Sequence, residues 1–210
     1  MAEPLSLVIN AGGESRRMGR SKALLPLPHS GEPLIRYMLR RLAPLVTGAT
    51  LVVSRDPQLL AVLQSLDGVR CIPDHYPGGG PLGGMATGLL NLSGWVLMMA
   101  CDLPLVDLAL CQYLVDLADE AGVEAGLRWQ AVVPIIDHVQ QPLHAVYHRA
   151  ALPAMERRLA AGERRAASFL ADLSVRWVTE AELERFDPQL RSFVNVNTPE
   201  EWAAVRHLLV

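Results

Sequence analysis

The sequence lacks several features that would place it in a specialised class of protein. It has only three cysteines, Cys71, Cys101 and Cys111, and no CxxC spacing, so neither a disulfide framework nor a zinc site is indicated. Its apolar runs all fall short of the roughly 20 residues that a membrane-spanning helix needs. Its start lacks the basic segment and apolar stretch of a signal peptide. We therefore expect a cytoplasmic protein that does not associate with a membrane.

The sequence also carries little net charge. The formal net charge is -3, which argues against a nucleic-acid binder held by a basic surface. Hydrophobic residues make up 50% of the chain and charged residues 20%, which is typical of a globular protein. We predict one domain over residues 1–210, with an N-terminal half that binds nucleotide and a C-terminal half that shapes the cleft for a second substrate.

Short apolar runs alternate with longer amphipathic ones in the first half of the chain. Strands are predicted at 5–9, 51–53, 69–72 and 94–101, and helices at 33–45 and from Pro57 to near Gly68. The run 94–101 is apolar almost throughout, as in a central strand covered on both faces. This alternation predicts an α/β fold with three layers and a mostly parallel central sheet.

The second half is less regular. Strands are predicted at 131–136, 143–147 and 174–178, and helices at 150–161 and 164–170. Thr198-Pro-Glu-Glu201 combines an N-cap threonine, a proline at the first helical position and a glutamate at the third. This combination predicts the start of a last helix.

The segment Asn10–Lys22 directly follows the first predicted strand. Ligands of open α/β sheets bind at the carboxyl ends of the strands, and paired glycines let backbone N–H groups approach a phosphate closely. Arg16, Arg17, Arg20 and Lys22 add four cations within seven residues. The segment therefore predicts a triphosphate site, the alternative being a solvated basic turn. Its spacing fits neither a Walker A loop nor a dinucleotide fingerprint.

Asp102 follows the apolar strand 94–101, so its carboxylate is expected at the same sheet edge as this loop. A hard oxygen ligand beside phosphates suits Mg²⁺. The alternative is a turn residue that leads into the helix after Pro104.

Two further segments have both a functional and a structural interpretation. Asp74 precedes the glycine-rich tract 78–84, which includes Gly83 and suits close packing against a base or ribose; otherwise the tract is a loop and a helix start. Asn195 and Asn197 are two residues apart and would face one side of a strand end, where either can supply an oxygen ligand. Otherwise Asn197 only prepares the turn at Thr198.

The histidines form no metal-binding pattern, although His144 and His148 flank a strand expected to line the second-substrate cleft. No GxSxG elbow or cysteine–histidine motif is present, so covalent catalysis is not indicated.

Together these segments resemble the molybdenum cofactor guanylyltransferase family of MobA-like nucleotidyltransferases. The family pattern AGGxSxRMGxDKALL is similar to AGGESRRMGRSKALL at 11–25. The family's GPLxGM, CDxP and NVNTPEE segments are similar to residues 80–85, 101–104 and 195–201, and its segment around AGERR is similar to 161–165. The resemblance runs from about residue 5 to residue 205.

The resemblance implies a Rossmann-like α/β/α sandwich of the nucleotide-diphospho-sugar transferase type. It also implies transfer of GMP from GTP to the phosphate of molybdopterin cofactor, with Mg²⁺ as cofactor and transient contact with molybdenum cofactor biosynthesis proteins or molybdoenzyme chaperones. Carried over by motif, the nucleotide contacts are Asn10, Ala11, Gly12, Gly13, Lys22, Asp74, Gly83 and Asp102. Lys22, Arg17 and Asp102 would be catalytic, and Asp102 and Asn197 would hold the metal.

Two residues depart from the family pattern. Asn10 stands where leucine is usual, and Ser21 replaces the aspartate before the lysine. Both positions bear on base or acceptor selection, so cytidylyl transfer to molybdopterin or to a sugar or alcohol phosphate stays open. A nucleotide-binding regulator or cofactor chaperone without turnover is the alternative from another class.

Overall fold

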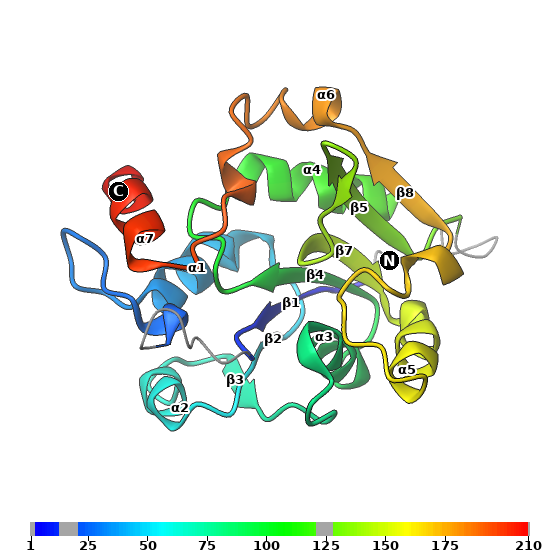
Figure 1. The fold of residues 1–210 in the computed structure, drawn as a ribbon, viewed down its shortest axis with the longest axis horizontal. Coiled ribbons are helices and arrows are strands. Elements are labelled where there is room, and N and C mark those ends of the chain that lie inside the picture. Colours follow the sequence, from blue (N-terminus) through cyan, green and yellow to red (C-terminus); the bar gives the residue numbers. More distant parts are fainter. Residues whose placement is uncertain (1–2, 13–20, 121–127, 210) are drawn as a thin grey trace.

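The computed structural model describes residues 3–12, 21–120 and 128–209. Its centre is an eight-stranded sheet with the strand order β3-β2-β1-β4-β7-β5-β6, in which β8 also pairs with β5 (Figure 1). The strands are β1 (Leu5–Asn10), β2 (Thr50–Val53), β3 (Val69–Ile72), β4 (Trp95–Ala100), β5 (Ala131–Ile136), β6 (Val139–Gln140), β7 (His144–His148) and β8 (Val175–Val178).

The sheet has a parallel half and a mostly antiparallel half. Strands β3, β2, β1 and β4 run parallel to one another. Strand β7 is antiparallel to both β4 and β5, and β8 returns to a parallel pairing with β5. Because every residue of β1 and β4 is buried, these two strands form the covered centre that their apolar sequences predict.

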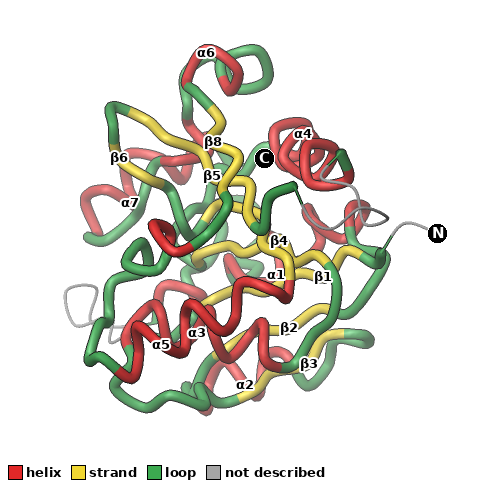
Figure 2. The backbone as a smooth tube through the Cα atoms, turned by 90° about the vertical axis from the view of Figure 1, so that its right-hand side faces the viewer, coloured by secondary structure: helices red, strands yellow, loops and turns green. Residues whose placement is uncertain are grey.

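Helices cover both faces of the sheet (Figures 1 and 2). One apolar core lies between the sheet and the side chains of α1, α2, α4 and α7, and a second lies between the opposite face and α3 and α5. The helices are α1 (Leu34–Leu42), α2 (Pro57–Leu63), α3 (Gly80–Leu90), α4 (Leu108–Asp119), α5 (Leu152–Ala160), α6 (Glu180–Leu183) and α7 (Pro199–Val205). The predicted three-layer α/β fold is confirmed.

The strand order places a ligand site between β1 and β4. The chain moves outward from β1 through β2 to β3 and then returns to the other side of β1 as β4. At such a switch point the loops after the two strands diverge, which leaves a crevice at their carboxyl ends. The predicted phosphate loop follows β1, and Asp102 follows β4, so the described ends of that loop, residues 10–12 and 21–22, lie with Asp102 at this crevice.

The helix predicted at 164–170 is wrong. Gly162 turns the chain at φ 85°, and the carbonyl of Arg164 accepts a hydrogen bond from the N–H of Leu82 in the first turn of α3. The start of the segment therefore bonds to a neighbouring helix, and the backbone bonds within it, from Ser168 N–H to Arg165 and from Leu170 N–H to Ala167, form turns instead of an α-helix. The helix after Asp56 is present with its predicted N-cap, but it ends at Leu63, several residues before Gly68.

Candidate active site

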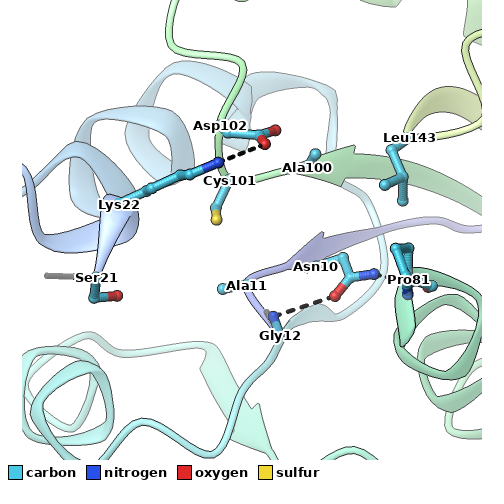
Figure 3. A pocket seen from close by; sticks show the side chains of 10 residues that line it. All are labelled: Asn10, Ala11, Gly12, Ser21, Lys22, Pro81, Ala100, Cys101, Asp102 and Leu143. Carbon is cyan, nitrogen blue, oxygen red and sulfur yellow. Dashed lines mark hydrogen bonds and ion pairs between the residues drawn. The ribbon is translucent and has the colours of Figure 1, made fainter. Parts of the chain in front are cut away.

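A pocket lies at the switch point, where the ends of β1 and β4 meet the start of α3 (Figure 3). The residues that line it are Asn10, Ala11, Gly12, Ser21, Lys22, Pro81, Ala100, Cys101, Asp102 and Leu143. Five of the predicted site residues are in this set. Gly13 and Arg17 lie outside the described residues.

Lys22 stands at the centre of a polar cluster in this pocket. Its Nζ donates hydrogen bonds to Asp102 Oδ2 at 3.1 Å and to Asn197 Oδ1 at 2.6 Å. The side chains of Lys22 and Asp102 are 15% and 24% exposed, so the pair is largely shielded from water. Three residues predicted from separate motifs therefore converge on one point.

The local structure explains why these three side chains meet. Lys22 begins a 3₁₀ turn, Lys22–Leu24, and the buried side chain of Ala23 anchors that turn. Asp102 follows β4 directly, while Asn197 precedes the N-cap of α7. Lys22 is also the only lysine among nineteen lysine and arginine residues in the sequence. Lys22 therefore carries a compact ammonium on a flexible stem, whereas every arginine of the chain carries a planar guanidinium group.

The side chain of Asn10 bonds to the backbone on two sides of the pocket. Its Oδ1 accepts from the N–H of Gly12 at 3.2 Å, and its Nδ2 donates to the carbonyl of Pro81 at 3.0 Å. The N–H of Ala11 donates to the carbonyl of Val53. Because the N–H groups of Ala11 and Gly12 already donate, a ligand contact at these residues would use their carbonyl oxygens. Asn10 fixes the start of the loop to the start of α3.

Asp74 and Gly83 lie beside the pocket and are not among its lining residues. Asp74 Oδ1 accepts from Thr87 Oγ1 at 2.9 Å and from the N–H of Tyr76 at 2.8 Å. A Cβ on Gly83 would lie 2.9 Å from the carbonyl of Tyr76 and 3.2 Å from Asp74 Oδ2. The absence of a side chain at Gly83 thus lets α3 approach the Asp74 loop. Thr87 orients Asp74, a role that no motif indicates.

The thiol of Cys101 lines the pocket, as Figure 3 shows. Burial and the nearby Asp102 carboxylate raise its pKa to about 12. A thiol with this pKa stays protonated near neutral pH, and the thiolate is the nucleophilic form.

The two histidines at the ends of β7 are not among the residues that line the pocket, although Leu143, directly before the strand, is. His144 is 1% exposed and packs on Phe193, with ring centroids 4.5 Å apart, and it contacts the Cys111 thiol at 3.5 Å. Burial lowers its pKa to about 4. His148 contacts Glu3 at 2.9 Å and packs against Trp95. Both side chains belong to the packing of the sheet.

Asn195 and Asn197 are placed differently, although both precede α7. Val196 between them is fully buried, Asn197 reaches Lys22, and Asn195 is exposed. Within residues 3–12, 21–120 and 128–209, no group of three or more histidine, cysteine, aspartate or glutamate side chains could hold a metal ion. A cation at this site would therefore depend on Asp102, an amide oxygen and its own substrate.

The fold and the site together define an open α/β protein with a polar pocket at the switch point of its sheet. The chain belongs to the MobA-like NTP transferase domain family, whose model matches residues 7–181. In the described part of the chain, no helix has both the length and the apolar character to cross a membrane.

Relatives of similar length match nearly the whole chain. A protein of Methanothermobacter thermautotrophicus named as a probable molybdenum cofactor guanylyltransferase is 34% identical, over 96% of this chain and 98% of its own. A molybdenum cofactor guanylyltransferase of Syntrophotalea carbinolica is 31% identical, over 94% of this chain and 88% of its own.

Solved structures share the fold. The molybdopterin-guanine dinucleotide biosynthesis protein A of Archaeoglobus fulgidus superposes with a TM-score of 0.80 at 28% identity, and 97% of each chain is covered. The 4-diphosphocytidyl-2C-methyl-D-erythritol synthase of Anaerococcus prevotii superposes with a TM-score of 0.68 at 16% identity, which shows a common fold alone.

Proposed function

We propose that this protein is a molybdenum cofactor guanylyltransferase, which transfers GMP from GTP to the terminal phosphate of molybdopterin and releases pyrophosphate. The likeness to guanylyltransferases over more than nine-tenths of the chain supports this substrate pair. The observation that carries the proposal is the convergence of Lys22, Asp102 and Asn197 at the switch point of the sheet. The proposed product is molybdopterin guanine dinucleotide.

The reaction asks little acid–base chemistry of the protein. A phosphate monoester is largely ionised near neutral pH. Its oxygen would attack the α-phosphorus of GTP, and the bond from that phosphorus to the bridging oxygen of pyrophosphate would break. Catalysis then consists of alignment and offsetting of negative charge, as in other phosphoryl transfers. We assign the supply of positive charge to Lys22 and to Arg17.

The donor set at the cluster fits Mg²⁺. A carboxylate oxygen and an amide oxygen converge on one cationic group, the Lys22 ammonium, at 3.1 and 2.6 Å. Oxygen donors of this kind suit Mg²⁺, which typically adds substrate phosphates and waters to one or two carboxylates. We therefore assign Asp102 and Asn197 to the metal, which when bound would neutralise phosphate charge.

Lys22 has a second consequence for this assignment. Its Nζ stands at the point on which both oxygens converge, so the two oxygens can share a metal there only if the lysine turns away. The four-carbon stem of lysine allows such a movement, and the triphosphate offers the ammonium a new partner. We propose that Lys22 exchanges its contacts with Asp102 and Asn197 for contacts with phosphate when nucleotide binds.

Two other parts of the proposal concern the surroundings of the enzyme. The product is a cofactor for other proteins, so the proposal includes transient contact with a molybdenum cofactor biosynthesis protein or a molybdoenzyme chaperone. It also includes a cytoplasmic location, where GTP is present.

The test is pyrophosphate release with purified molybdopterin as acceptor and either GTP or CTP as donor. We expect turnover with GTP and Mg²⁺, and a loss of about 10²-fold or more in kcat for Lys22→Ala, since removing one charge-stabilising donor typically has this effect. Arg40→Ala, which removes an exposed cation paired with Glu32, is the control and should leave kcat unchanged. A preference for CTP would establish cytidylyl transfer instead. Tight binding of GTP without any pyrophosphate release would establish a non-catalytic carrier.

A further inference from the structure

The segment that carries Asn197 has to be positioned without the help of a strand. Residues 194–197 belong to no helix or strand, although Asn197 Oδ1 lies 2.6 Å from Lys22 Nζ. Close to Asn197, the N–H of Val196 donates to the carbonyl of Asp102 at 2.9 Å. Glu201 Oε2 accepts from the N–H of Asn197 at 2.5 Å. These bonds orient Val196 and Asn197, but they do not hold the beginning of the segment in place.

The beginning of the segment is held by a buried polar network around Ser192. Ser192 is fully buried, and both its N–H and its Oγ donate to Asp187 Oδ2 at 2.7 Å. Its Oγ also accepts from the N–H of Asp107 at 3.1 Å. The Ser192 hydroxyl therefore bridges a carboxylate that is 8% exposed and a backbone N–H of another segment.

The two segments joined in this way are those that carry the proposed metal ligands. Asp107 ends the loop that Asp102 begins, and Ser192 starts the stretch that leads to Asn197. Ser192 Oγ bonds one end of the loop, while the N–H of Val196 bonds its other end at Asp102. Hydrogen bonds thus join the loop and the segment at both ends. Asp102 and Asn197 both lie at the end where Val196 bonds to Asp102.

The turn before Ser192 is held in an unfavourable backbone conformation. Leu190 has φ 48° and ψ 32°, in the left-handed region that side chains other than glycine rarely occupy. Its N–H donates to the carbonyl of Asp187 at 2.9 Å, and its carbonyl accepts from the N–H of Phe193 at 3.1 Å. Such strain persists where the surroundings determine the conformation, and it gathers near functional sites.

We propose that Ser192, oriented by Asp187, is a positioning residue of the active site: it holds the Asn197 segment against the Asp102–Asp107 loop and so sets where the Asn197 oxygen lies relative to Asp102 and Lys22. This inference rests on the proposed function for its catalytic consequence. Its structural content, the placement of Asn197 beside Lys22, stands apart from any turnover.

The first test compares two buried serines. Ser192→Ala removes the bridging hydroxyl, whereas Ser6→Ala removes another buried hydroxyl that accepts a backbone N–H, that of Ala49, at the opposite end of β1. With both variants equally folded, we expect Ser192→Ala to lower kcat about tenfold or more, because small misplacements of reacting groups are costly. Ser6→Ala should stay near the wild-type value. Equal activities of the two variants would overturn the proposal.

A double-mutant cycle distinguishes positioning from a general structural effect. If Ser192 acts through Asn197, Ser192→Ala should have little further effect on kcat in an Asn197→Ala background. If the two losses multiply in full, Ser192 acts elsewhere and the proposal is wrong. Should Ser192→Ala not fold, Asp187→Asn takes its place in the cycle, since its amide oxygen can still accept from Ser192 as a weaker partner. It should give a smaller loss that also vanishes in the Asn197→Ala background.

The lone lysine provides a measurement that needs no turnover. Protein labelled with ¹³C at lysine Cε gives one side-chain resonance, that of Lys22, whose chemical shift reports its contacts with Asp102 and Asn197. We expect this resonance to move in Ser192→Ala and in Asn197→Ala and to stay in place in Ser6→Ala. A resonance unchanged in Ser192→Ala would overturn the positioning role. If the wild-type protein releases no pyrophosphate, the proposed function fails, and this measurement still decides the inference.

Discussion

The two halves of the sheet deliver residues to the same site by different means. In the parallel half, β1 and β4 end side by side, so Asn10 and Asp102 arrive at one edge through backbone register alone. Beyond β4 the strands reverse, and the polar side chain that contacts Lys22 from the C-terminal half, that of Asn197, comes from a segment outside the sheet. That segment depends on the side chains of Ser192, Asp187 and Glu201.

This difference predicts different vulnerabilities. Register in a buried parallel sheet is fixed by many hydrogen bonds, so single side chains there should matter mainly through packing. A segment held by a few buried polar contacts should respond to individual substitutions and to protonation. Three measurements test this contrast.

The largest effect is expected from acid. His144, under the C-terminal segment, has its pKa lowered by burial to about 4, whereas an unfolded histidine titrates near 6.5. The unfolded chain therefore takes up a proton first, so stability is complete above about pH 6.5 and falls as the pH drops towards 4. The loss attributable to this group amounts to about 3 kcal/mol.

Urea unfolding at about pH 7.5 and about pH 4.5 measures this loss. His144→Phe keeps a ring against Phe193 and cannot titrate, so its stability should fall less than that of the wild type over the same interval. Equal losses in the two proteins would contradict a histidine buried in its neutral form.

The next effect tests packing in the parallel half. A Cβ on Gly84 would overlap the side chain of Asn10, lying 2.6 Å from its Nδ2. Gly84→Ala should therefore lower the free energy of unfolding by about 1–3 kcal/mol, as overpacking usually does. In an Asn10→Ala background the obstructing atoms are gone, so the same substitution should have almost no effect on stability. If the two losses simply add in the double variant, Asn10 is not the obstacle.

The smallest effect compares two helix caps. Thr198 Oγ1 accepts from the N–H of Glu201 at the start of α7, and Asp56 Oδ1 accepts from the N–H of Gln58 at the start of α2. Replacing either residue by alanine should lower the free energy of unfolding by about 1 kcal/mol. Only Thr198→Ala should also lower kcat, because Glu201 holds the N–H of Asn197 as well. Equal kcat values would show that α7 is not coupled to the site.

The same contrast explains how much could be predicted from the sequence. Strands β1 and β4 are apolar runs closely followed by Gly12 and Asp102, so periodicity and the strand-edge rule predicted that Asp102 and the loop from Asn10 to Lys22 share one edge of the sheet. The role of Ser192 could not be predicted, because its partners Asp187 and Asp107 follow no local pattern and only tertiary packing brings them together. The predicted helix at 164–170 is wrong for a related reason, since the carbonyl of Arg164 accepts a hydrogen bond from the first turn of α3, which is distant in sequence.

His144 shows a further limit of sequence reasoning. His144 lies at the start of a strand that was expected to line the second-substrate cleft. Because side chains alternate along a strand, its side chain instead points into the core and packs against Phe193. Asn10 is polar at a position where the family usually has leucine. Its side chain nevertheless has hydrogen-bond partners, the carbonyl of Pro81 and the N–H of Gly12.

The solitary lysine has a practical consequence for following this protein in solution. An endoprotease that cleaves only after lysine has a single target in the whole chain, the bond between Lys22 and Ala23, where Ala23 is 1% exposed. Cleavage there requires the 3₁₀ turn to open, so the rate of this one cut measures how often the mouth of the pocket unfolds. Ligands that close over the turn will protect the bond, and each can be ranked by that protection on a simple gel.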